Sequence, residues 1–254
     1  MKVALIQAEL IWEDPEANRK QFEHKIGGLD DHPDLIVLPE MFTTGFTMNP
    51  GHIPPEEGER TLEWMQQQAD RTDAGVVGSM VFQENGQYFN RLIFMQPGGV
   101  YDSYDKRHTF TLAGEDRVYR RGTERTIIQF RDFTFCPLIC YDLRFPVWSR
   151  NTEDYDVLLY VANWPSPRIG AWDTLLRARS IENMAYTLGV NRIGSDPNGL
   201  TYNGHSAGFD GMGNRLAYSD REEVLHVILS KAHLEESRNK FRFLDDRDHF
   251  TLKP

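Results

Sequence analysis

The sequence predicts an α/β fold in which helices are layered on a mixed β-sheet. Segments with the periodicity of amphipathic helices alternate with short apolar runs typical of buried strands, in both halves of the chain. Turn signals at Asn85-Gly86 and Gly98-Gly99 indicate hairpins between some of the strands. Because no internal repeat, low-complexity segment or linker interrupts this alternation, we expect a single domain over residues 1–254.

In the first half of the chain, apolar runs predict most of the sheet. Strands are expected at 3–8, 34–38, 74–82, 89–95 and 100–104. Helices are expected at 15–26, with Phe22 and Ile26 facing inward, and at 60–71. The strand at 34–38 runs directly into Pro39 and Glu40, which places a carboxylate at a strand end.

The second half repeats the pattern around a central apolar strand. Strands are expected at 125–130, 133–139, 157–162, 188–193, 207–210, 215–218 and 224–229. Helices are expected at 146–151, 172–186 and 231–243. The strand at 133–139 delivers Cys140 at its end.

Composition and charge exclude several functional classes. With 254 residues, 40% hydrophobic and 26% charged, the chain has the composition of a soluble globular protein. A formal net charge of −10 argues against binding nucleic acid through a basic surface. No run of about 20 apolar residues and no signal peptide is evident, so we expect no membrane partner and a cytoplasmic location.

The two cysteines are expected to be free thiols. Cys136 and Cys140 lie four residues apart in one predicted strand, so their side chains point the same way about 13 Å apart, which is too far for a disulfide. Cys136 is interpreted as a packing residue. For Cys140 alone, burial in the core would also be the ordinary interpretation, because free cysteine is among the most buried residue types.

The residues around Cys140 suggest a reactive thiol instead. The stretch from Phe135 to Pro146 indicates a strand, a turn and the start of a helix, with Cys140 at the turn. Backbone N–H groups at such a turn, and the positive end of the following helix, would favour a thiolate and a developing oxyanion.

Two other strand ends offer groups that complete a catalytic set. Glu40 and Lys106 follow apolar strands in the same manner as Cys140. If neighbouring strands end at one edge of the sheet, a thiol nucleophile, a carboxylate base and a cation for the oxyanion meet there. Glu40 or Lys106 alone would be weak support for a catalytic site, because a Glu or Lys after a strand is usually a solvated surface residue.

Three motifs in this order resemble the signature segments of the nitrilase, or carbon–nitrogen hydrolase, superfamily. They read LPEMFTTGF, YDKRHTF followed by GED, and LICYDLRFP, and the resemblance extends through NWP and RARSIEN. It implies a four-layer α-β-β-α sandwich that forms a homodimer. It also implies that Glu40, Lys106 and Cys140 are catalytic and that Glu115 is a second catalytic glutamate.

The mechanism implied by the resemblance passes through a cysteine thioester. Glu40 would act as the base, and Lys106 with the backbone N–H of Tyr141 would bind the oxyanion. Glu115 would steer the substrate amide and hold Lys106 or Glu40 in position. Neither a metal nor a cofactor is expected, because the eight histidines are scattered without HxH or HExxH pairing.

The residues after the nucleophile bear on the substrate. True nitrilases typically have Cys-Trp-Glu, whereas this chain has Cys140-Tyr141-Asp142, which resembles the small amidase branch. The whole-chain pattern most resembles the bacterial ω-amidases, which implies hydrolysis of a small-molecule amide such as 2-oxoglutaramate. Another amide or N-carbamoyl hydrolase of the superfamily remains an alternative.

A substrate with a distal carboxylate needs a cation or N–H donors to bind it. Candidate arginines on loops after strands are Arg117, Arg120, Arg121 and Arg168, and the sequence does not choose among them. Trp164 either forms a wall of the pocket or caps the core.

Two further sets of charged residues are given structural interpretations. Asp142 and Arg144 are interpreted mainly as an ion pair within the turn. Arg177, Arg179 and Glu182 are interpreted as a charge network on a helix surface or a dimer interface.

Two alternatives of a different kind remain open at this point. His108 or His205 could serve as the base of a Cys–His thiol hydrolase. The fold could also be a non-enzymatic interaction module that retains a relic triad, although a complete set of Glu40, Lys106, Glu115 and Cys140 argues against decay.

Overall fold

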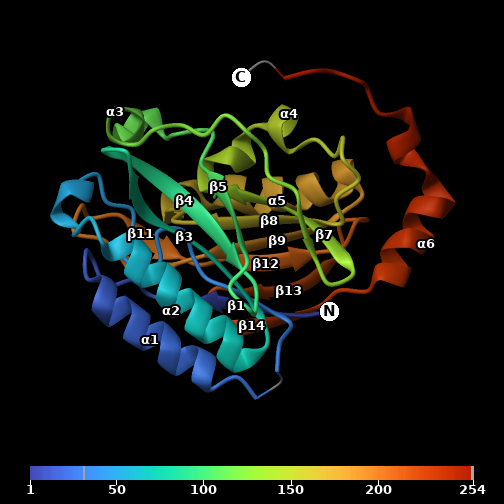
Figure 1. Ribbon diagram of the computed structural model, residues 1–254. Coiled ribbons are helices and arrows are strands. Elements are labelled where there is room, and N and C mark those ends of the chain that lie inside the picture. The colour runs from blue at the N-terminus through green and yellow to red at the C-terminus, as the bar shows by residue number, and fades with distance from the viewer. Residues whose placement is uncertain (31, 253–254) are drawn as a thin grey trace.

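Two six-stranded mixed sheets stack face to face between outer helices (Figure 1). The computed structural model describes residues 1–30 and 32–252. Helices α1 (Pro15–Gly27) and α2 (Glu57–Thr72) cover the first sheet, and α5 (Ile169–Asn183) covers the second. The four-layer α-β-β-α sandwich expected from the motifs is therefore confirmed.

Each sheet combines parallel and antiparallel pairing. Across the first sheet the strands are β14 (Glu223–Ile228), β1 (Lys2–Gln7), β2 (Leu35–Val37), β3 (Gly75–Glu84), β4 (Gln87–Met95) and β5 (Tyr101–Asp105). Across the second they are β13 (Arg215–Ser219), β12 (Ser206–Phe209), β9 (Tyr186–Asn191), β8 (Val157–Ala162), β7 (Phe133–Ile139) and β6 (Ile128–Phe130). The central strands β1, β2 and β3 are parallel, as are β7, β8 and β9.

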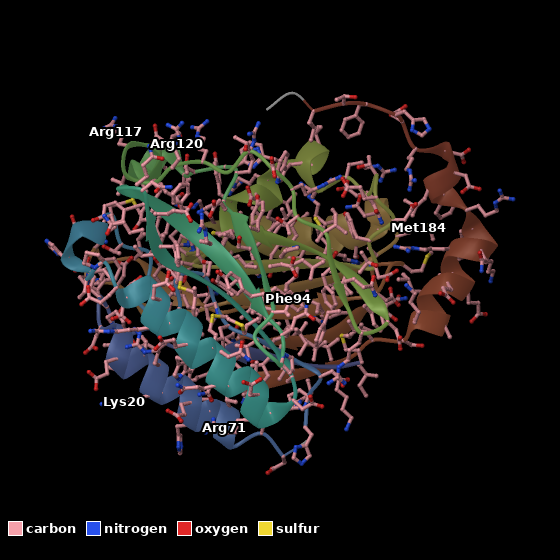
Figure 2. All side chains as sticks on the ribbon, viewed as in Figure 1. Lys20, Arg71, Phe94, Arg117, Arg120 and Met184 are labelled. Atoms are coloured by element: carbon pink, nitrogen blue, oxygen red, sulfur yellow. The ribbon has the colours of Figure 1, made fainter. Side chains whose placement is uncertain are left out.

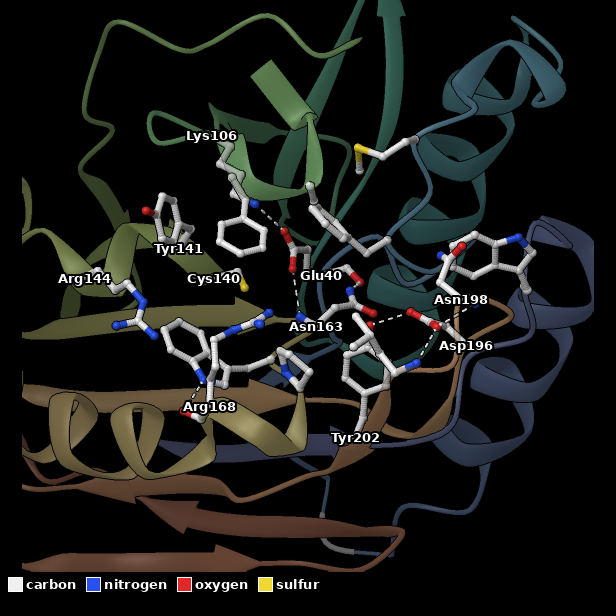
Figure 3. Close-up of a pocket in the computed structure, with 18 of the residues that line it drawn as sticks. Glu40, Lys106, Cys140, Tyr141, Arg144, Asn163, Arg168, Asp196, Asn198 and Tyr202 are labelled. Carbon is white, nitrogen blue, oxygen red and sulfur yellow. Dashed lines mark hydrogen bonds and ion pairs between the residues drawn. The ribbon is translucent and has the colours of Figure 1, made fainter. Parts of the chain in front are cut away.

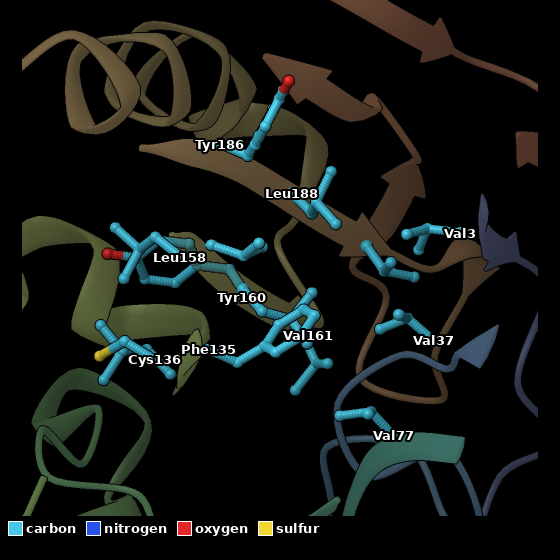
Figure 4. Close-up of a cluster of buried hydrophobic side chains, with 14 of the residues drawn as sticks. Val3, Val37, Val77, Phe135, Cys136, Leu158, Tyr160, Val161, Tyr186 and Leu188 are labelled. Carbon is cyan, nitrogen blue, oxygen red and sulfur yellow. The ribbon is translucent and has the colours of Figure 1, made fainter. Parts of the chain in front are cut away.

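The main core lies between the two sheets (Figure 4). Val3, Val37 and Val77 of the first sheet face a cluster from the second sheet that includes Val161 and Leu188. Both faces of the central strands are covered, which is why these strands have nearly continuous apolar sequences rather than an alternating pattern. Burying each such side chain contributes about 1.5–3 kcal/mol, so this interface supplies much of the stability.

A further helix, near the C-terminus, packs at the edge of the sandwich. The predicted helix at 231–243 is observed as α6 (Lys231–Phe241). Its Arg238 donates to Asp156 at 3.2 Å, and Lys231 also pairs with this buried carboxylate. The loss of Asp156 would thus leave two cations of α6 without their common partner.

Most predicted elements are confirmed with small shifts at their ends. The Asn85-Gly86 hairpin is present, and both residues have the positive φ values, 50° and 74°, that its tight turn requires. The helix predicted at 172–186 spans 169–183 instead, because Met184 has left-handed φ and Tyr186 already pairs with β8. The strand predicted at 125–130 begins at Ile128.

The sequence missed one hairpin and predicted one helix that is too long. Strands β10 (Ile193–Ser195) and β11 (Thr201–Asn203) form a separate two-stranded hairpin. The helix predicted at 146–151 is only one turn, α4 (Pro146–Ser149). Neither 193–195 nor 201–203 contains an apolar run that would identify it as a strand in the sequence.

The strand ends that carry polar residues lie at one end of the sandwich. Glu40 follows β2 after two residues, Lys106 follows β5 directly, and Cys140 follows β7 directly. Because β5 is antiparallel to β4, which is antiparallel to β3, its end lies beside the ends of the parallel strands. This is the end of an α/β sheet at which ligands usually bind.

Gly122 supports Lys106 through very close backbone packing. Its N–H donates to the Lys106 carbonyl at 3.0 Å, and a Cβ atom added to it would lie 2.1 Å from the Asp105 carbonyl oxygen. Gly122→Ala should therefore lower the free energy of unfolding by about 1–3 kcal/mol through overpacking. Urea unfolding would measure the loss.

The matched control is Gly170→Ala in the first turn of α5. A Cβ atom at Gly170 meets nothing within 4 Å, so this substitution should be neutral or stabilise the helix by up to about 1 kcal/mol. Equal effects of the two substitutions would contradict the packing explanation for Gly122.

Candidate active site

A cavity of about 320 Å³ opens where the strand ends converge (Figure 3). Glu40, Lys106 and Cys140 line it together. Much of the remaining wall is aromatic and comes from segments that follow strands of both sheets and from the β10–β11 hairpin: Trp12, Phe46, Phe110, Tyr141, Trp164 and Tyr202. The structure thus brings together in one pocket three residues that are separated by up to 100 positions in the sequence.

Glu40 is fully buried, and N–H donors hold both of its carboxylate oxygens. Oε1 accepts hydrogen bonds from Lys106 Nζ at 2.8 Å and from Asn90 Nδ2 at 2.8 Å. Oε2 accepts from the backbone N–H of Asn163 at 2.8 Å. Donors on both oxygens stabilise the charged form of the carboxylate and fix its orientation beside Cys140.

Lys106 lies between two carboxylates with only 1% of its surface exposed. Its Nζ donates to Glu40 at 2.8 Å and to the two oxygens of Glu115 at 2.9 and 3.0 Å. Burial acts to lower the pKa of Lys106, but Glu115 and Glu40 outweigh it and raise the pKa above its ordinary value. The ammonium therefore remains a cation in the pocket wall.

Glu115 is the first residue of the short helix α3 (Glu115–Val118) and is also fully buried. Burial raises the pKa of Glu115, Lys106 opposes this shift, and the nearby Glu40 adds to it. Its Oε2 also accepts from the backbone N–H of Phe110. Glu115 thus connects Lys106 to the loop that forms one wall of the pocket.

Cys140 has a strained backbone, with φ at 44°. Burial raises the pKa of its thiol well above the usual value, the Glu40 carboxylate raises it further, and Lys106 offsets these effects only in part. The thiol is therefore protonated at neutral pH. This corrects the expectation that a helix dipole favours the thiolate, because Cys140 begins a 3₁₀ turn, η3 (Cys140–Arg144), and not a long helix.

Asp142 fixes the turn that presents Cys140, but not as an ion pair with Arg144. Its carboxylate accepts from the Ile139 N–H at 3.0 Å, the Tyr104 hydroxyl at 2.8 Å and the His108 N–H at 3.0 Å. The predicted pair is therefore wrong: buried donors from the neighbouring segments already occupy Asp142, and Arg144 is directed elsewhere.

Arg144 and Arg168 both line the pocket, on the same side of Cys140 (Figure 3). Arg144 lies over the Trp164 ring, with 4.9 Å from its guanidinium carbon to the ring centroid, and Arg168 lies over Phe110 at 5.1 Å. Trp164 donates its indole N–H to the Arg168 carbonyl at 2.8 Å. Trp164 is thus a pocket wall as well as a buried core residue, and it supports both cations.

The other candidate arginines do not reach the pocket. Arg117 and Arg120 are exposed and point outward beside α3 (Figure 2). Arg121 donates to the Thr109 hydroxyl at 2.9 Å instead. Arg117 faces outward because α3 turns Glu115 into the protein, and a residue two positions later lies on the opposite side of a helix.

The two candidate histidine bases are held away from the pocket. His108 Nδ1 lies 2.7 Å from Asp142, and its ring stacks on Phe145. His205 Nδ1 lies 3.0 Å from the carboxylate of Asp173. Neither histidine lines the cavity that contains Cys140.

Sequence reasoning missed several residues of the pocket. Asn90 lies in the middle of β4, and Asn163 follows β8 in the NWP segment. Opposite the arginines, the β10–β11 hairpin contributes Asp196 and Tyr202, which are joined by a 2.8 Å hydrogen bond (Figure 3). Asn163 could have been recognised as a pocket residue because it follows an apolar strand. Nothing in the sequence around Asn90 distinguishes it from other residues of its strand.

Arg179 does not belong to a surface network. It is buried in α5, its Nη2 donates to the Leu143 carbonyl at 2.7 Å, and its Nη1 donates to Glu182 at 2.9 Å. The predicted surface role is therefore wrong for this residue. Arg179 instead connects α5 to the turn after Cys140.

Residues 1–30 and 32–252 also bear on metal binding, membrane spanning and disulfide formation. No group of three or more His, Cys, Asp or Glu side chains in these residues is arranged to hold a metal ion. No helix there has the length and apolar character that crossing a membrane requires. Cys136 and Cys140 are both free, and Cys136 is packed in the core as expected.

The chain is similar to known proteins over nearly its whole length. The sequence model of the carbon–nitrogen hydrolase family matches residues 2–239. Omega-amidase YafV of Escherichia coli (strain K12) is 43% identical over 99% of this chain and 98% of its own length. The 2-oxoglutaramate amidase of Bacillus subtilis (strain 168) is 32% identical over 92% of each chain.

A solved structure also superposes over the whole chain. It is that of XC1258 from Xanthomonas campestris, described as a CN-hydrolase superfamily protein with an arsenic adduct in the active site. The TM-score is 0.96 at 38% identity, over 100% of this chain and 99% of the other. The family model spans nearly the whole chain and the fold superposes over all of it, so the chain belongs to the carbon–nitrogen hydrolase family.

Proposed function

We propose that this enzyme hydrolyses the terminal amide of a short 2-oxo dicarboxylic acid monoamide, such as 2-oxoglutaramate, to the acid and ammonia. The observation that carries this proposal is the pair Arg144 and Arg168, which lines the pocket that also holds Cys140, Glu40 and Lys106. Two pocket cations suit the distal carboxylate of such a substrate. The names of the two relatives, an omega-amidase and a 2-oxoglutaramate amidase, support the same substrate class.

In the first half of the proposed reaction, Cys140 is acylated. Glu40 takes the thiol proton as Sγ attacks the amide carbon, and the carbonyl oxygen gains the negative charge. Lys106 Nζ and the backbone N–H of Tyr141 stabilise this oxyanion. Glu40 then gives the proton to the amide nitrogen, the carbon–nitrogen bond breaks, and ammonia leaves a thioester on Cys140. The raised pKa of Cys140 is the reason that a neighbouring base is needed.

In the second half, water releases the acid. Glu40 takes a proton from water while the oxygen attacks the thioester carbon, and the same oxyanion site stabilises the intermediate. The carbon–sulfur bond then breaks, and Glu40 returns the proton to the departing thiolate. The enzyme recovers its starting protonation state without a metal or cofactor taking part.

Glu115 is proposed to hold the cation in position throughout both steps. Its two oxygens accept from Lys106 Nζ at 2.9 and 3.0 Å. Lys106 therefore stays in place when Glu40 becomes neutral during the reaction. Removing one partner from a buried ion pair typically costs about 3–5 kcal/mol, so loss of Glu115 would disturb Lys106 strongly.

We also propose that residues 1–254 form one domain, that the enzyme is a homodimer and that it acts in the cytoplasm. Two free cysteines are consistent with a reducing compartment. Ile181 on α5 is 48% exposed, and Met212 beside Gly213, which packs against Ile181, is 37% exposed. Apolar side chains on the outer helical layer are typical of a subunit interface.

The dimer can be tested by sedimentation velocity. The enzyme should sediment at twice the mass of one chain, and Ile181→Asp should shift it towards the monomer, because a charge would be buried in the interface. A wild-type monomer at micromolar concentration would contradict the homodimer.

The identity of the base and the covalent intermediate can be tested together. Glu40→Gln should lower kcat by about 10²–10⁴-fold, while His205→Ala should retain most of the activity, because only Glu40 lines the pocket. Mass spectrometry of wild-type enzyme quenched during turnover should show the acyl group on Cys140. An active Glu40→Gln enzyme would instead favour a histidine base, and no acylation would argue against the thioester.

The substrate class can be tested by steady-state kinetics with 2-oxoglutaramate, asparagine, N-carbamoyl-β-alanine, butyramide and a simple nitrile. We expect 2-oxoglutaramate to have the highest kcat/KM. Arg144→Ala should raise its KM about 10–100-fold, as for a lost charge-assisted hydrogen bond, and should change butyramide kinetics little, because butyramide has no carboxylate.

Arg117→Ala is the matched control, since Arg117 is exposed outside the pocket. It should leave the kinetics for both substrates unchanged. If 2-oxoglutaramate has no advantage over the neutral amide, the proposed substrate is wrong even if the enzyme is an amidase.

A further inference from the structure

Asn90 touches three members of the proposed catalytic set. It lies in β4 with 1% of its surface exposed. Its Nδ2 donates to Glu40 Oε1 at 2.8 Å and lies 3.3 Å from Glu115 Oε1. Its backbone carbonyl accepts from the Lys106 N–H at 3.0 Å. No other role assigned above accounts for this residue.

The charges around Asn90 explain why an amide is useful there. Two carboxylates share one ammonium group in a buried site, so the cluster of Glu40, Glu115 and Lys106 carries one excess negative charge when both acids are ionised. Like charges at such a distance favour protonation of one acid. The amide N–H groups of Asn90 oppose this by stabilising the charged carboxylates without adding a charge.

The orientation of the Asn90 amide is also informative. Its Oδ1 is buried and has no hydrogen-bond partner among the residues that the structure describes. Rotating the amide by 180° would place Oδ1 against the oxygens of Glu40 and Glu115. The chain thus leaves one acceptor unsatisfied, at a cost of about 1–3 kcal/mol, in order to direct Nδ2 at the two acids.

We propose that Asn90 is a positioning residue that keeps Glu40 ionised and directed at Cys140. The proposal rests on the proposed role of Glu40 as the base, but not on the identity of the substrate. Asn90 does not contact the reacting atoms. It acts through Glu40, and it steadies Glu115 and the main chain of Lys106 at the same time.

The groups that face Glu40 from the surrounding elements are few. Titratable neighbours are Lys106 at the end of β5, Glu115 in α3 and Cys140 in η3. Tyr119 lies further away and donates its hydroxyl to the Thr47 carbonyl. The neutral donors to Glu40 are Asn90 and the backbone N–H of Asn163, and only the first can be removed by substitution.

The test is the pH dependence of iodoacetamide alkylation at Cys140, located by peptide mass mapping, because this reaction needs no amide substrate. In the wild type, the rate should fall at acidic pH as Glu40 becomes protonated. Losing the Asn90 donor favours the protonated form of the Glu40 carboxyl. In Asn90→Ala the acid limb, meaning the fall of the alkylation rate at acidic pH, should therefore move up by about one pH unit. In Asn90→Asp it should move further, because a third carboxylate repels the charge of Glu40.

Steady-state kinetics of the same variants provide a second measurement. For Asn90→Ala, kcat/KM at neutral pH should fall about 10–100-fold, the size expected for a lost hydrogen bond to a charged group. The acid limb of kcat/KM should shift in the same direction as the alkylation limb. If Asn90 had only a packing role, its substitution would lower kcat/KM at every pH and leave the pH of the acid limb unchanged.

Asn151→Ala is the matched control, because Asn151 is an equally buried asparagine whose amide donates to the Tyr155 and Asn183 carbonyls. It should lower stability and leave the acid limb unchanged. Should Asn90→Ala and Asn90→Asp fail to fold, Asn90→Ser provides a smaller neutral variant for the same titration.

Two outcomes separate the possible failures. A folded Asn90 variant whose alkylation limb coincides with that of the wild type overturns the role of Asn90. The alkylation rate of the wild type should fall at acidic pH, and Glu40→Gln should abolish this fall. If it does not, Glu40 is not the base, and the proposed mechanism fails instead. The substrate proposal is unaffected by either result.

Discussion

The buried ion pair between Lys106 and its two carboxylates is the constraint on which the rest of the site depends. Burying three charges is costly, and their mutual contacts offset this cost only when every partner is present and well placed. Glu40 and Lys106 come from strand ends of the first sheet, and Glu115 comes from the short helix α3. Glu40 also accepts from the backbone N–H of Asn163, which follows β8, so the cluster is joined to the second sheet as well.

Cys140 enters this arrangement from the second sheet. Its strained backbone and its turn are held by Asp142, which accepts hydrogen bonds from Tyr104 in β5 of the first sheet and from His108 just after it. Cys140, the proposed nucleophile, is thus tied to the same segment that carries Lys106. One chain segment orients the cation and the thiol relative to each other, which suits a reaction that needs both within reach of one carbonyl group.

Outside the group of Cys140, Glu40 and Lys106, the pocket carries opposite charges on its two sides. Arg144 and Arg168 lie on one side of Cys140, and Asp196 lies on the other (Figure 3). A substrate with a carboxylate at one end would be drawn towards the arginines and repelled from the aspartate. The same asymmetry would orient the amide at the opposite end towards the thiol. In the proposed function, binding and orientation would thus arise from the same few charges.

The sequence by itself determined the layered α/β fold and most strand positions, and the resemblance of its motifs implied the set of Glu40, Lys106, Glu115 and Cys140. Apolar periodicity is local, and the three motifs are contiguous in the chain. Their meeting at one end of the sandwich was predictable because strand ends gather at a sheet edge.

Only the tertiary structure decided what each charged side chain contacts. Asp142 bonds across the sheets rather than to Arg144, and Arg144 faces the pocket while Arg117 faces outward. The proton state of Cys140 also required the structure, because burial and Glu40 outweigh the local effect of the turn. Side-chain direction and burial depend on residues distant in sequence, and a single sequence contains no record of those contacts.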